Sequence, residues 1–240
     1  MKILMTGYDG YIGSHLSIYL SNRGYTVIPY IGNILNFDIS EEDIPDMVIH
    51  LAALTGVRKS IEMPDEYFKV NVLGTREVFL VCDILDIPLI FASSSNAKEV
   101  NNPYAETKLI NEIDRIKNSL GVRPHTVFPG RDDMLYQSIL RGDVKYINGA
   151  HYRDFTHIDD LCSAIFTLID NYGIMVGKVV DIGTGISVSV LEVANAMGWN
   201  GDVKYDPTPN ERVKTSADIS ELSSLGWKPE RNILDEHRIL

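Results

Sequence analysis

The sequence predicts an α/β fold with a doubly wound parallel sheet. Its first thirty residues carry the pattern, because an apolar strand at 2–6 is followed by a glycine turn at 7–13, an amphipathic helix at 14–24 and a second strand at 25–30. Four more strands are expected at 46–52, 88–94, 125–128 and 178–183. Helical stretches separate them, notably at 65–85, 105–120 and 157–170. Strands that alternate with helices favour a parallel sheet covered on both faces.

The texture of the chain changes at Pro129, where short apolar runs, glycines and prolines replace the regular alternation. We therefore expect a second, smaller lobe to begin there. The helix at 157–170 and the strand at 178–183 are expected to return to the main sheet, which makes the small lobe discontinuous. The predicted division is a main domain of residues 1–128 and 154–182, and a small C-terminal lobe of residues 129–153 and 183–240.

The composition argues against two classes of partner. A net charge of −11, from 22 Lys and Arg against 33 Asp and Glu, leaves no broad cationic face for a nucleic acid. No run approaches the ~18 apolar residues that cross a membrane. We therefore expect no nucleic-acid partner, no membrane partner and a cytoplasmic location. Cys82 and Cys162 lie inside apolar runs without metal-ligand spacing, which favours two reduced core residues and no metal site.

The glycine turn predicts a dinucleotide site. Gly7, Gly10 and Gly13 stand between the first strand and the first helix, so backbone N–H groups and the helix N-terminus would face a pyrophosphate. A tight structural turn is the alternative interpretation. The second strand ends without an acid for the ribose hydroxyls and without a cation for a 2′-phosphate, which Asp9 would repel. NAD is therefore expected in preference to NADP.

Tyr104 and Lys108 are the candidate catalytic pair. They stand four residues apart in a helical stretch, so both side chains lie on one face. An ammonium beside a phenol lowers its pKa, which suits the phenol to exchange a proton with a substrate hydroxyl. Upstream, a strand ends in the serines 93–95, whose hydroxyls would lie at the carboxyl edge of the sheet, where ligands bind in open α/β folds. A solvated helix pair and capping or turn serines are the alternatives.

Eight short segments occur in an order that resembles a known family. They are GYDGYIG, VIHLAA, NVLGT, FASSS, YAETK, RDFTHIDD, DIGTG and ADISELSSLGW. Together they resemble the extended short-chain dehydrogenases/reductases, in their NAD-dependent nucleotide-sugar epimerase/dehydratase branch, over nearly the whole chain. The resemblance implies a Rossmann fold whose main domain binds the dinucleotide and whose small lobe binds a nucleotide-activated sugar. It also implies a homodimer formed through the helices at 65–85 and 105–120.

The resemblance assigns roles residue by residue. It implies catalysis by Ser95, by Tyr104 as acid and base, and by Lys108, which would also bind the nicotinamide ribose. The residues implied to bind the cofactor are Gly7, Gly10, Tyr11, Ile12, Gly13, Asp38, Ile39, Leu51, Ala52, Ala53, Tyr104 and Lys108. The residues implied to bind the substrate are Ser95, Thr126, Arg131 and Arg153.

Several of these residues have plainer interpretations. Asp38 would either meet the adenine amino group, as the resemblance implies, or cap a helix that begins near Ser40. His50 is interpreted as a buried histidine with satisfied ring nitrogens. Asn71 matches a structural asparagine of the family. Asp159 and Asp160 are interpreted as the acidic first turn of a helix, without a chemical role.

The chain also departs from the family pattern. Only nine positions separate Ser95 from Tyr104, where the family has a longer loop that helps to cover the sugar. Thr126 stands where an asparagine usually touches the substrate. Thr208 stands where a nucleotide-binding arginine is expected, and Arg212 is displaced from that position. These departures concern the substrate side of the expected site.

Three functions are compatible with these residues. The leading one is an NAD-dependent epimerase that transiently oxidises a sugar hydroxyl. The enzyme alternative is a 4-keto reductase or a 4,6-dehydratase of the same sugars. Dehydratases of the family carry an Asp-Glu pair after the catalytic Ser or Thr, and here Asn96 and Ala97 stand there. The third is a dinucleotide-binding sensor without turnover, which the fold alone does not exclude.

Overall fold

The protein is described by a computed structural model that covers residues 1–40, 42–206 and 208–237. Its main feature is a six-stranded sheet with the order β10-β5-β4-β3-β1-β2. The strands are β1 (Lys2–Thr6), β2 (Thr26–Pro29), β3 (Met47–His50), β4 (Leu89–Ala92), β5 (Ser119–Pro124) and β10 (Val179–Ile182). The pairings that join β1 to β2, β1 to β3, β3 to β4 and β4 to β5 are all parallel. The predicted α/β fold with a parallel sheet is confirmed.

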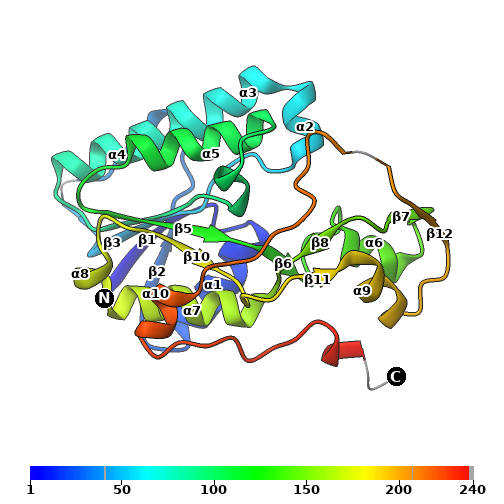
Figure 1. Cartoon of the computed structure of the whole chain (residues 1–240). Helices are drawn as coiled ribbons and strands as arrows, with labels where there is room; N and C mark the ends of the chain where they lie inside the picture. The colour runs from blue at the N-terminus through cyan, green and yellow to red at the C-terminus, as the bar shows by residue number, and fades with distance from the viewer. Residues whose placement is uncertain (41, 207, 238–240) are drawn as a thin grey trace. The chain divides into compact units, whose positions relative to one another are not determined.

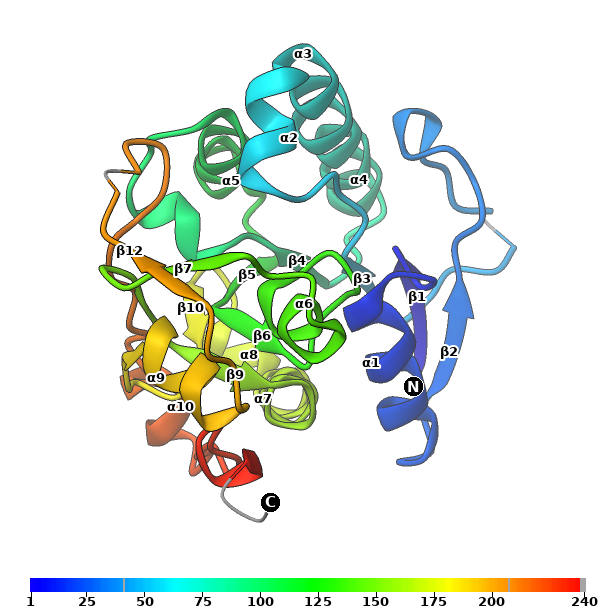
Figure 2. The same cartoon turned by 90° about the vertical axis from the view of Figure 1, so that its right-hand side faces the viewer.

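The strand order reverses at β1, because the chain passes from β1 to one neighbour, β2, and continues on the other side through β3. The sheet therefore has its topological switch point between β1 and β3. Ligands of open α/β sheets bind outside the carboxyl ends of the strands at such a point. Figure 2 shows β2 at the edge of the sheet and β1 inside it.

The helices lie on both faces of this sheet, with α4 and α5 on one face and α1 on the other (Figure 1). They are α1 (Tyr11–Ser21), α2 (Val57–Glu62), α3 (Pro64–Phe68), α4 (Gly74–Ile84), α5 (Pro103–Asp114), α6 (Leu135–Arg141), α7 (Ile158–Asp170), α8 (Tyr172–Met175), α9 (Val190–Ala196) and α10 (Ser220–Ser224). None of the helices among the described residues combines the length and the apolar character needed to cross a membrane.

The chain divides into two compact units. Unit 1 comprises Met1–Arg123 and Leu168–Val180, and unit 2 comprises Pro124–Thr167 and Asp181–Leu240.

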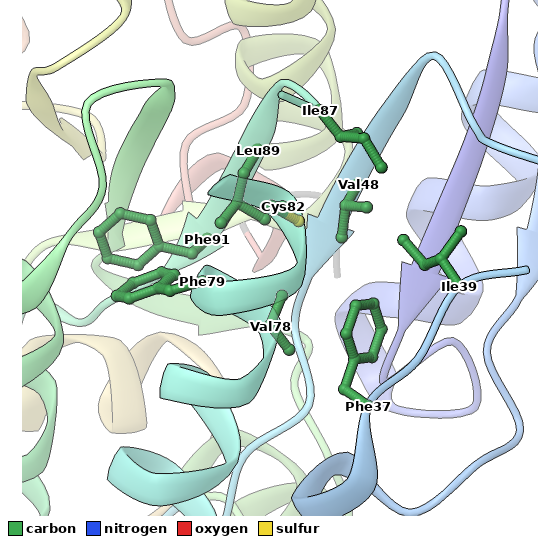
Figure 3. Packing of buried hydrophobic residues seen from close by; sticks show 9 residues of the cluster. All are labelled: Phe37, Ile39, Val48, Val78, Phe79, Cys82, Ile87, Leu89 and Phe91. Carbon is green, nitrogen blue, oxygen red and sulfur yellow. The ribbon is translucent and has the colours of Figure 1, made fainter. Parts of the chain in front are cut away.

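The core of unit 1 includes a cluster of nine buried residues that joins the sheet to α4 (Figure 3). The cluster comprises Phe37, Ile39, Val48, Val78, Phe79, Cys82, Ile87, Leu89 and Phe91. The rings of Phe79 and Phe91 meet edge to face, with centroids 5.2 Å apart, a favoured geometry for an aromatic pair. Both cysteines of the chain, Cys82 and Cys162, are buried and neither forms a disulfide, which confirms their interpretation as reduced core residues.

The helix expected at 105–120 is wrong in its second half. The chain leaves α5 at Arg115, whose ψ of 141° is extended, and residues 119–124 form β5 beside β4. The predicted strand 125–128 contains β6 (Thr126–Phe128), which pairs with β9 (Phe155–His157) in a separate sheet. The strand β5 was missed because polar residues before it continue the helical pattern. Residues 119–122 are all buried, and they form a strand inside the sheet instead of the end of a helix.

The helical stretch expected at 65–85 consists of three pieces. A π-helix, η2 (Lys69–Leu73), lies between α3 and α4. Such widened turns occur often at functional sites. This one contains Asn71, which is fully buried.

Unit 2 is built from short elements around its own core. Its two-stranded sheets are β6 with β9, β7 (Tyr146–Asn148) with β12 (Asp202–Lys204), and β8 (Tyr152–Arg153) with β11 (Val188–Ser189). The core residues are Phe128, Ile139, Ile147, Phe155, Val190, Val193, Ala194 and Ile233. Asp159 and Asp160 form the acidic first turn of α7, as predicted. The Asp160 carboxylate also accepts the backbone N–H groups of Glu230 and Arg231, each at 3.0 Å.

Candidate active site

The glycine turn lies at the switch point of the sheet. Gly7 follows β1 with a φ of +67°, and a Cβ atom there would lie 2.6 Å from the backbone nitrogen of Ala52. Leu51 and Ala52 follow β3 and donate their N–H groups to the carbonyl and the hydroxyl of Thr6, both at 3.2 Å. The carboxyl ends of β1 and β3 therefore meet backbone to backbone, and only glycine fits at position 7.

The second half of the turn opens α1. The N–H of Gly10 donates to the carbonyl of Gly7 at 3.1 Å. A Cβ on Gly13 would lie 2.1 Å from that same carbonyl oxygen. Tyr11 and Ile12, the first residues of α1, are half-buried. Because Gly10 and Gly13 have no side chains, the N-terminus of α1 is open toward the glycine turn. Such a helix N-terminus is suited to bind the pyrophosphate of a dinucleotide.

Asp38 and Ile39 border a small hollow of about 150 Å³, which Leu4, Ile28 and Tyr30 also line. Its volume is below that of ordinary ligand pockets, so it could receive only one end of a dinucleotide. The Asp38 carboxylate is exposed and accepts the N–H of Ile39 at 2.9 Å. No helix begins near Ser40 among the residues that the structure describes, so the capping alternative for Asp38 is wrong.

The three serines after β4 have three different surroundings. Ser93 donates its hydroxyl to the carboxylate of Glu112. Ser94 caps the 3-10 helix η3 (Ser95–Lys98), accepting the N–H of Asn96 at 3.2 Å. Ser95 is the first residue of η3 and is 8% exposed. The capping alternative therefore applies to Ser94.

Tyr104 and Lys108 lie one turn apart near the start of α5, as their spacing predicts. The half-buried ring of Tyr104 meets that of Tyr67 edge to face, with centroids 6.3 Å apart. Lys108 is 4% exposed, and its ammonium donates to the carbonyl of Ala92 at 2.8 Å. Burial lowers the pKa of Lys108 to about 8, although the carboxylate of Glu112 opposes this shift. A buried lysine one helical turn from a tyrosine is an arrangement suited to proton transfer.

His50 lies on β3, beneath the loop of Leu51 and Ala52. Its ring nitrogens contact the hydroxyls of Thr6 and Thr75, at 2.7 and 3.0 Å. Burial, with a smaller contribution from Lys108, lowers the pKa of His50 to about 3, so the ring is neutral at physiological pH. The interpretation as a satisfied buried histidine is confirmed.

Asn71 connects the loop after β3 to α5. Its amide accepts the N–H of Leu54 at 2.8 Å and donates to the carbonyl of Leu54 at 2.9 Å. It also donates to the hydroxyl of Thr107 at 3.2 Å. Ala53, half-buried, immediately precedes Leu54 in this loop. These contacts agree with a structural role for Asn71.

Three of the residues expected to bind the substrate, Thr126, Arg131 and Arg153, lie in unit 2. Thr126 is half-buried at the start of β6. Arg131 is paired with Asp133 at 3.0 Å. Arg153, on β8, donates to the carbonyls of Tyr152 and Val213 at 2.9 and 3.1 Å, and its Nη2 lies 3.8 Å from a carboxylate oxygen of Glu211. A phosphate at Arg153 would therefore share the guanidinium with Glu211.

Asp154, next to Arg153, was not singled out from the sequence. It is fully buried, and its carboxylate accepts four hydrogen bonds of 2.8 to 2.9 Å. The donors are the N–H and hydroxyl of Thr184 and the N–H groups of Gly185 and Ala217. One side chain thus holds the DIGTG and ADIS segments together. In the sequence, only its position next to Arg153 could have drawn attention to Asp154 as a functional residue.

The fold and the glycine turn define a dinucleotide-binding enzyme of the Rossmann class. Residues 3–183 match the model of the NAD dependent epimerase/dehydratase family. The chain belongs to this family, and the resemblance inferred from its motifs is confirmed. It is accordingly an NAD-dependent enzyme of the epimerase/dehydratase type, and NAD is its cofactor.

Similar proteins are found along the full chain. A Methanocaldococcus jannaschii protein, provisionally named a UDP-glucose 4-epimerase, is 29% identical over 95% of this chain and 93% of its own. The structure of UDP-glucuronic acid 4-epimerase from Bacillus cereus, in complex with UDP-glucuronic acid and NAD, is 27% identical with a TM-score of 0.85, covering 98% of this chain and 96% of that one. The structure of MoeE5 with UDP-glucose and NAD is 27% identical with a TM-score of 0.87, covering 98% and 95%.

The shortened loops noted in the sequence have a counterpart in these alignments. The alignment with the Methanocaldococcus jannaschii protein runs over 288 positions, whereas this chain has 240 residues. Segments of that relative therefore have no equivalent here.

Proposed function

We propose that this protein is an NAD-dependent 4-epimerase of UDP-activated sugars. The observation that carries the proposal is the start of α5, where Tyr104 stands one helical turn before the buried Lys108. Two of the similar proteins with known structures bind UDP-sugars together with NAD. One of them and the Methanocaldococcus jannaschii relative are named as 4-epimerases.

In the proposed reaction Tyr104 accepts the proton of the sugar 4-hydroxyl and later returns it to the same oxygen. The configuration is inverted because hydrogen is restored to the opposite face of the sugar carbon. Ser95, almost buried at the start of η3, donates or accepts a hydrogen bond at the same sugar oxygen. The positive charge of Lys108 stabilises the phenolate of Tyr104 as long as the exchanged proton is on the sugar oxygen. When bound, NAD supplies the oxidant that removes hydrogen from the sugar carbon and then restores it.

The cofactor would be held along the carboxyl ends of β1 and β3. Gly7, Gly10 and Gly13 would receive the pyrophosphate, with Tyr11 and Ile12 contributing the first N–H groups of α1. Asp38 and Ile39 would meet the adenine, while Leu51, Ala52 and Ala53 would line the middle of the cofactor. This assignment is supported by the close approach of Gly7 to the backbone of Leu51 and Ala52, which leaves no room for a side chain at position 7.

The two parts of the chain would divide the work, with the predicted main domain binding NAD and the predicted small lobe binding the nucleotide-sugar. Thr126, Arg131 and Arg153 are the proposed substrate contacts there. Arg153 is the candidate for the diphosphate, since a planar guanidinium binds phosphate oxygens two at a time. Binding would have to replace its contact with Glu211.

A dehydratase is the second candidate, and one observation disfavours it. Elimination of water from the sugar needs an acid and a base beside the catalytic hydroxyl. Here Asn96 uses its side-chain amide to contact Ser94, and Ala97 is a buried methyl group. Neither side chain can exchange a proton at this place.

The test begins with the small molecules that the purified protein carries. Mass spectrometry of the released ligands should find NAD, and incubation with UDP-glucose or UDP-glucuronic acid should produce the 4-epimer without net consumption of NAD. Loss of water from the sugar would favour the dehydratase. Absence of turnover with each UDP-, dTDP- and GDP-sugar tried would favour the sensor.

We further propose a cytoplasmic homodimer. The cytoplasmic location rests on the proposed ligands, which are charged metabolites that do not cross a membrane unaided. The dimer rests on the apolar side chains that α4 and α5 leave exposed, among them Leu80, Ile84 and Ile113, which are 53%, 71% and 69% exposed.

A further inference from the structure

A buried carboxylate lies one helical turn beyond Lys108. Glu112 is 4% exposed, and its carboxylate accepts hydrogen bonds from Arg123 on β5, at 2.7 Å from Nε and 2.5 Å from Nη2. It also accepts the hydroxyl of Ser93 at the end of β4. A buried charge of this kind is kept only where cations and donors surround it. Nothing in the proposed proton exchange uses this cluster directly.

The cluster is joined to the candidate catalytic residues by two neighbouring contacts. Ala92 accepts the Lys108 ammonium through its carbonyl, and the next residue, Ser93, binds Glu112. Ala92, the last residue of β4, and Ser93, which follows it, thus hold two successive turns of α5. Because Lys108 and Glu112 are four residues apart, their side chains lie on the same face of the helix.

We propose that Glu112 is a positioning residue for Lys108, which keeps the buried ammonium protonated and pins α5 to the strand that leads to Ser95. Among the residues that the structure describes, the ammonium donates to a neutral carbonyl, that of Ala92. Burial favours loss of its proton, and the one opposing influence on the pKa of Lys108 is the carboxylate of Glu112. The inference rests on the proposed function insofar as Lys108 is a working residue there.

The other titratable groups near Lys108 cannot replace Glu112. They are Tyr104 on the same helix, Tyr67 on α3 and His50 on β3. Tyr67 keeps its proton in a hydrogen bond to the carbonyl of Thr55, and the low pKa of His50 leaves its ring without charge. The phenolate of Tyr104 exists only at one stage of the proposed reaction, so it does not replace the carboxylate of Glu112. Arg123 acts on Lys108 through Glu112, because it neutralises part of the same carboxylate. Removal of Glu112 and removal of Arg123 should therefore shift the pKa of Lys108 in opposite directions.

The experiment measures the pKa of Lys108 itself. The full-length protein is produced with ¹³C at lysine Cε and purified without removal of bound ligands. The Lys108 resonance is assigned by its absence in Lys108→Met. It is then followed by NMR through a pH titration. In Glu112→Gln, which keeps the shape and the acceptor but removes the charge, the pKa should fall by about one unit. In Arg123→Gln it should rise. Ser93→Ala is the matched control, since it removes a contact of the same carboxylate but no charge, and should leave the pKa where it is.

A merely structural Glu112 gives a different result. Glu112→Gln would then lower the unfolding temperature while leaving the Lys108 titration unchanged, which overturns the inference. If Glu112→Gln does not fold, Arg123→Gln decides, and an unchanged or lower pKa of Lys108 there also overturns it. With an active enzyme, the alkaline limb of turnover should move to lower pH in Glu112→Gln. The NMR shift needs no substrate, so failure of the proposed epimerase activity would remain distinguishable.

Discussion

Tyr104 depends on two neighbours that act in different ways. Tyr67 meets its ring edge to face and fixes where the ring lies. Lys108, one helical turn away, brings a charge that is maintained in a buried place. Tyr67 affects only the packing of the Tyr104 ring, whereas Lys108 affects how readily the Tyr104 hydroxyl exchanges its proton. A hydroxyl deleted from either tyrosine should therefore have distinct consequences.

Tyr104→Phe should lower turnover by the ~10²- to 10⁴-fold typical of a lost general acid or base, because the ring stays and the proton carrier is gone. NAD binding and the unfolding temperature should stay close to the wild type. Epimerisation of a UDP-sugar, followed by chromatography, measures the effect. The matched control is Tyr67→Phe, which removes a 2.7 Å hydrogen bond to the carbonyl of Thr55. It should cost about 1 kcal/mol of stability and little turnover. A Tyr104→Phe enzyme with wild-type rates would contradict the assignment.

His50 makes a pH-dependent contribution to stability. Its folded pKa of about 3 lies below the unfolded value of 6.5, so between these values the unfolded chain binds a proton that the folded chain does not. The free energy of unfolding should therefore fall as the pH drops below 6.5, by up to about 1.4 kcal/mol per unit from this group. Urea unfolding at pH 7, 6 and 5 measures the slope. His50→Asn should be less stable at pH 7 and flatter over the same range. An equal slope in both proteins would exclude His50 as its source.

At the scale of the elements, the glycine turn has little tolerance. Gly13→Ala would place a methyl group 2.1 Å from the carbonyl oxygen of Gly7, and backbone on both sides leaves nowhere for it to move. We expect a loss of more than about 3 kcal/mol or failure to fold, with NAD binding abolished in any folded fraction. Gly173→Ala is the control, because a Cβ in α8 meets nothing within 4 Å and alanine favours a helix. Thermal unfolding and calorimetric titration with NAD compare the two. Normal NAD binding by Gly13→Ala would show that the turn is not the cradle.

The elements show what the sequence could predict and what it could not. The turn from β1 through α1 to β2 was predicted because strand period, glycines and helix period agree over thirty residues. The strand β5 was missed because Lys117 and Asn118 continue a polar, helical pattern up to its start. The cluster of Ser93, Glu112 and Arg123 could not be found in this way, since its members come from a strand end, a helix and a neighbouring strand. Only the tertiary pairing of β4 with β5 brings them together.

At the scale of the whole molecule, the proposed dimer is the feature most open to a direct test. Replacing Leu80 and Ile84 of α4 together by Glu should convert the protein from a dimer to a monomer, because two charges would be buried in an apolar contact. Size-exclusion chromatography with light scattering measures the mass. Ile18→Glu provides the control, since Ile18 is 63% exposed on α1, on the other face of the sheet. A wild-type monomer, or dissociation by Ile18→Glu instead, would refute the proposed interface.

The short chain leaves unit 2 with small two-stranded sheets, which raises the question of what makes it cooperative. The carboxylate of Asp154 answers it, because its four donors come from segments about thirty and sixty residues further along the chain. If one of those segments detached alone, the buried carboxylate of Asp154 would lose hydrogen-bond donors, which is costly for a buried charge. The amide hydrogens of Gly185 and Ala217 should therefore exchange with solvent only when unit 2 opens as a whole, and at one common rate. In that sense a single side chain sets the size of the smallest piece of this lobe that can unfold by itself.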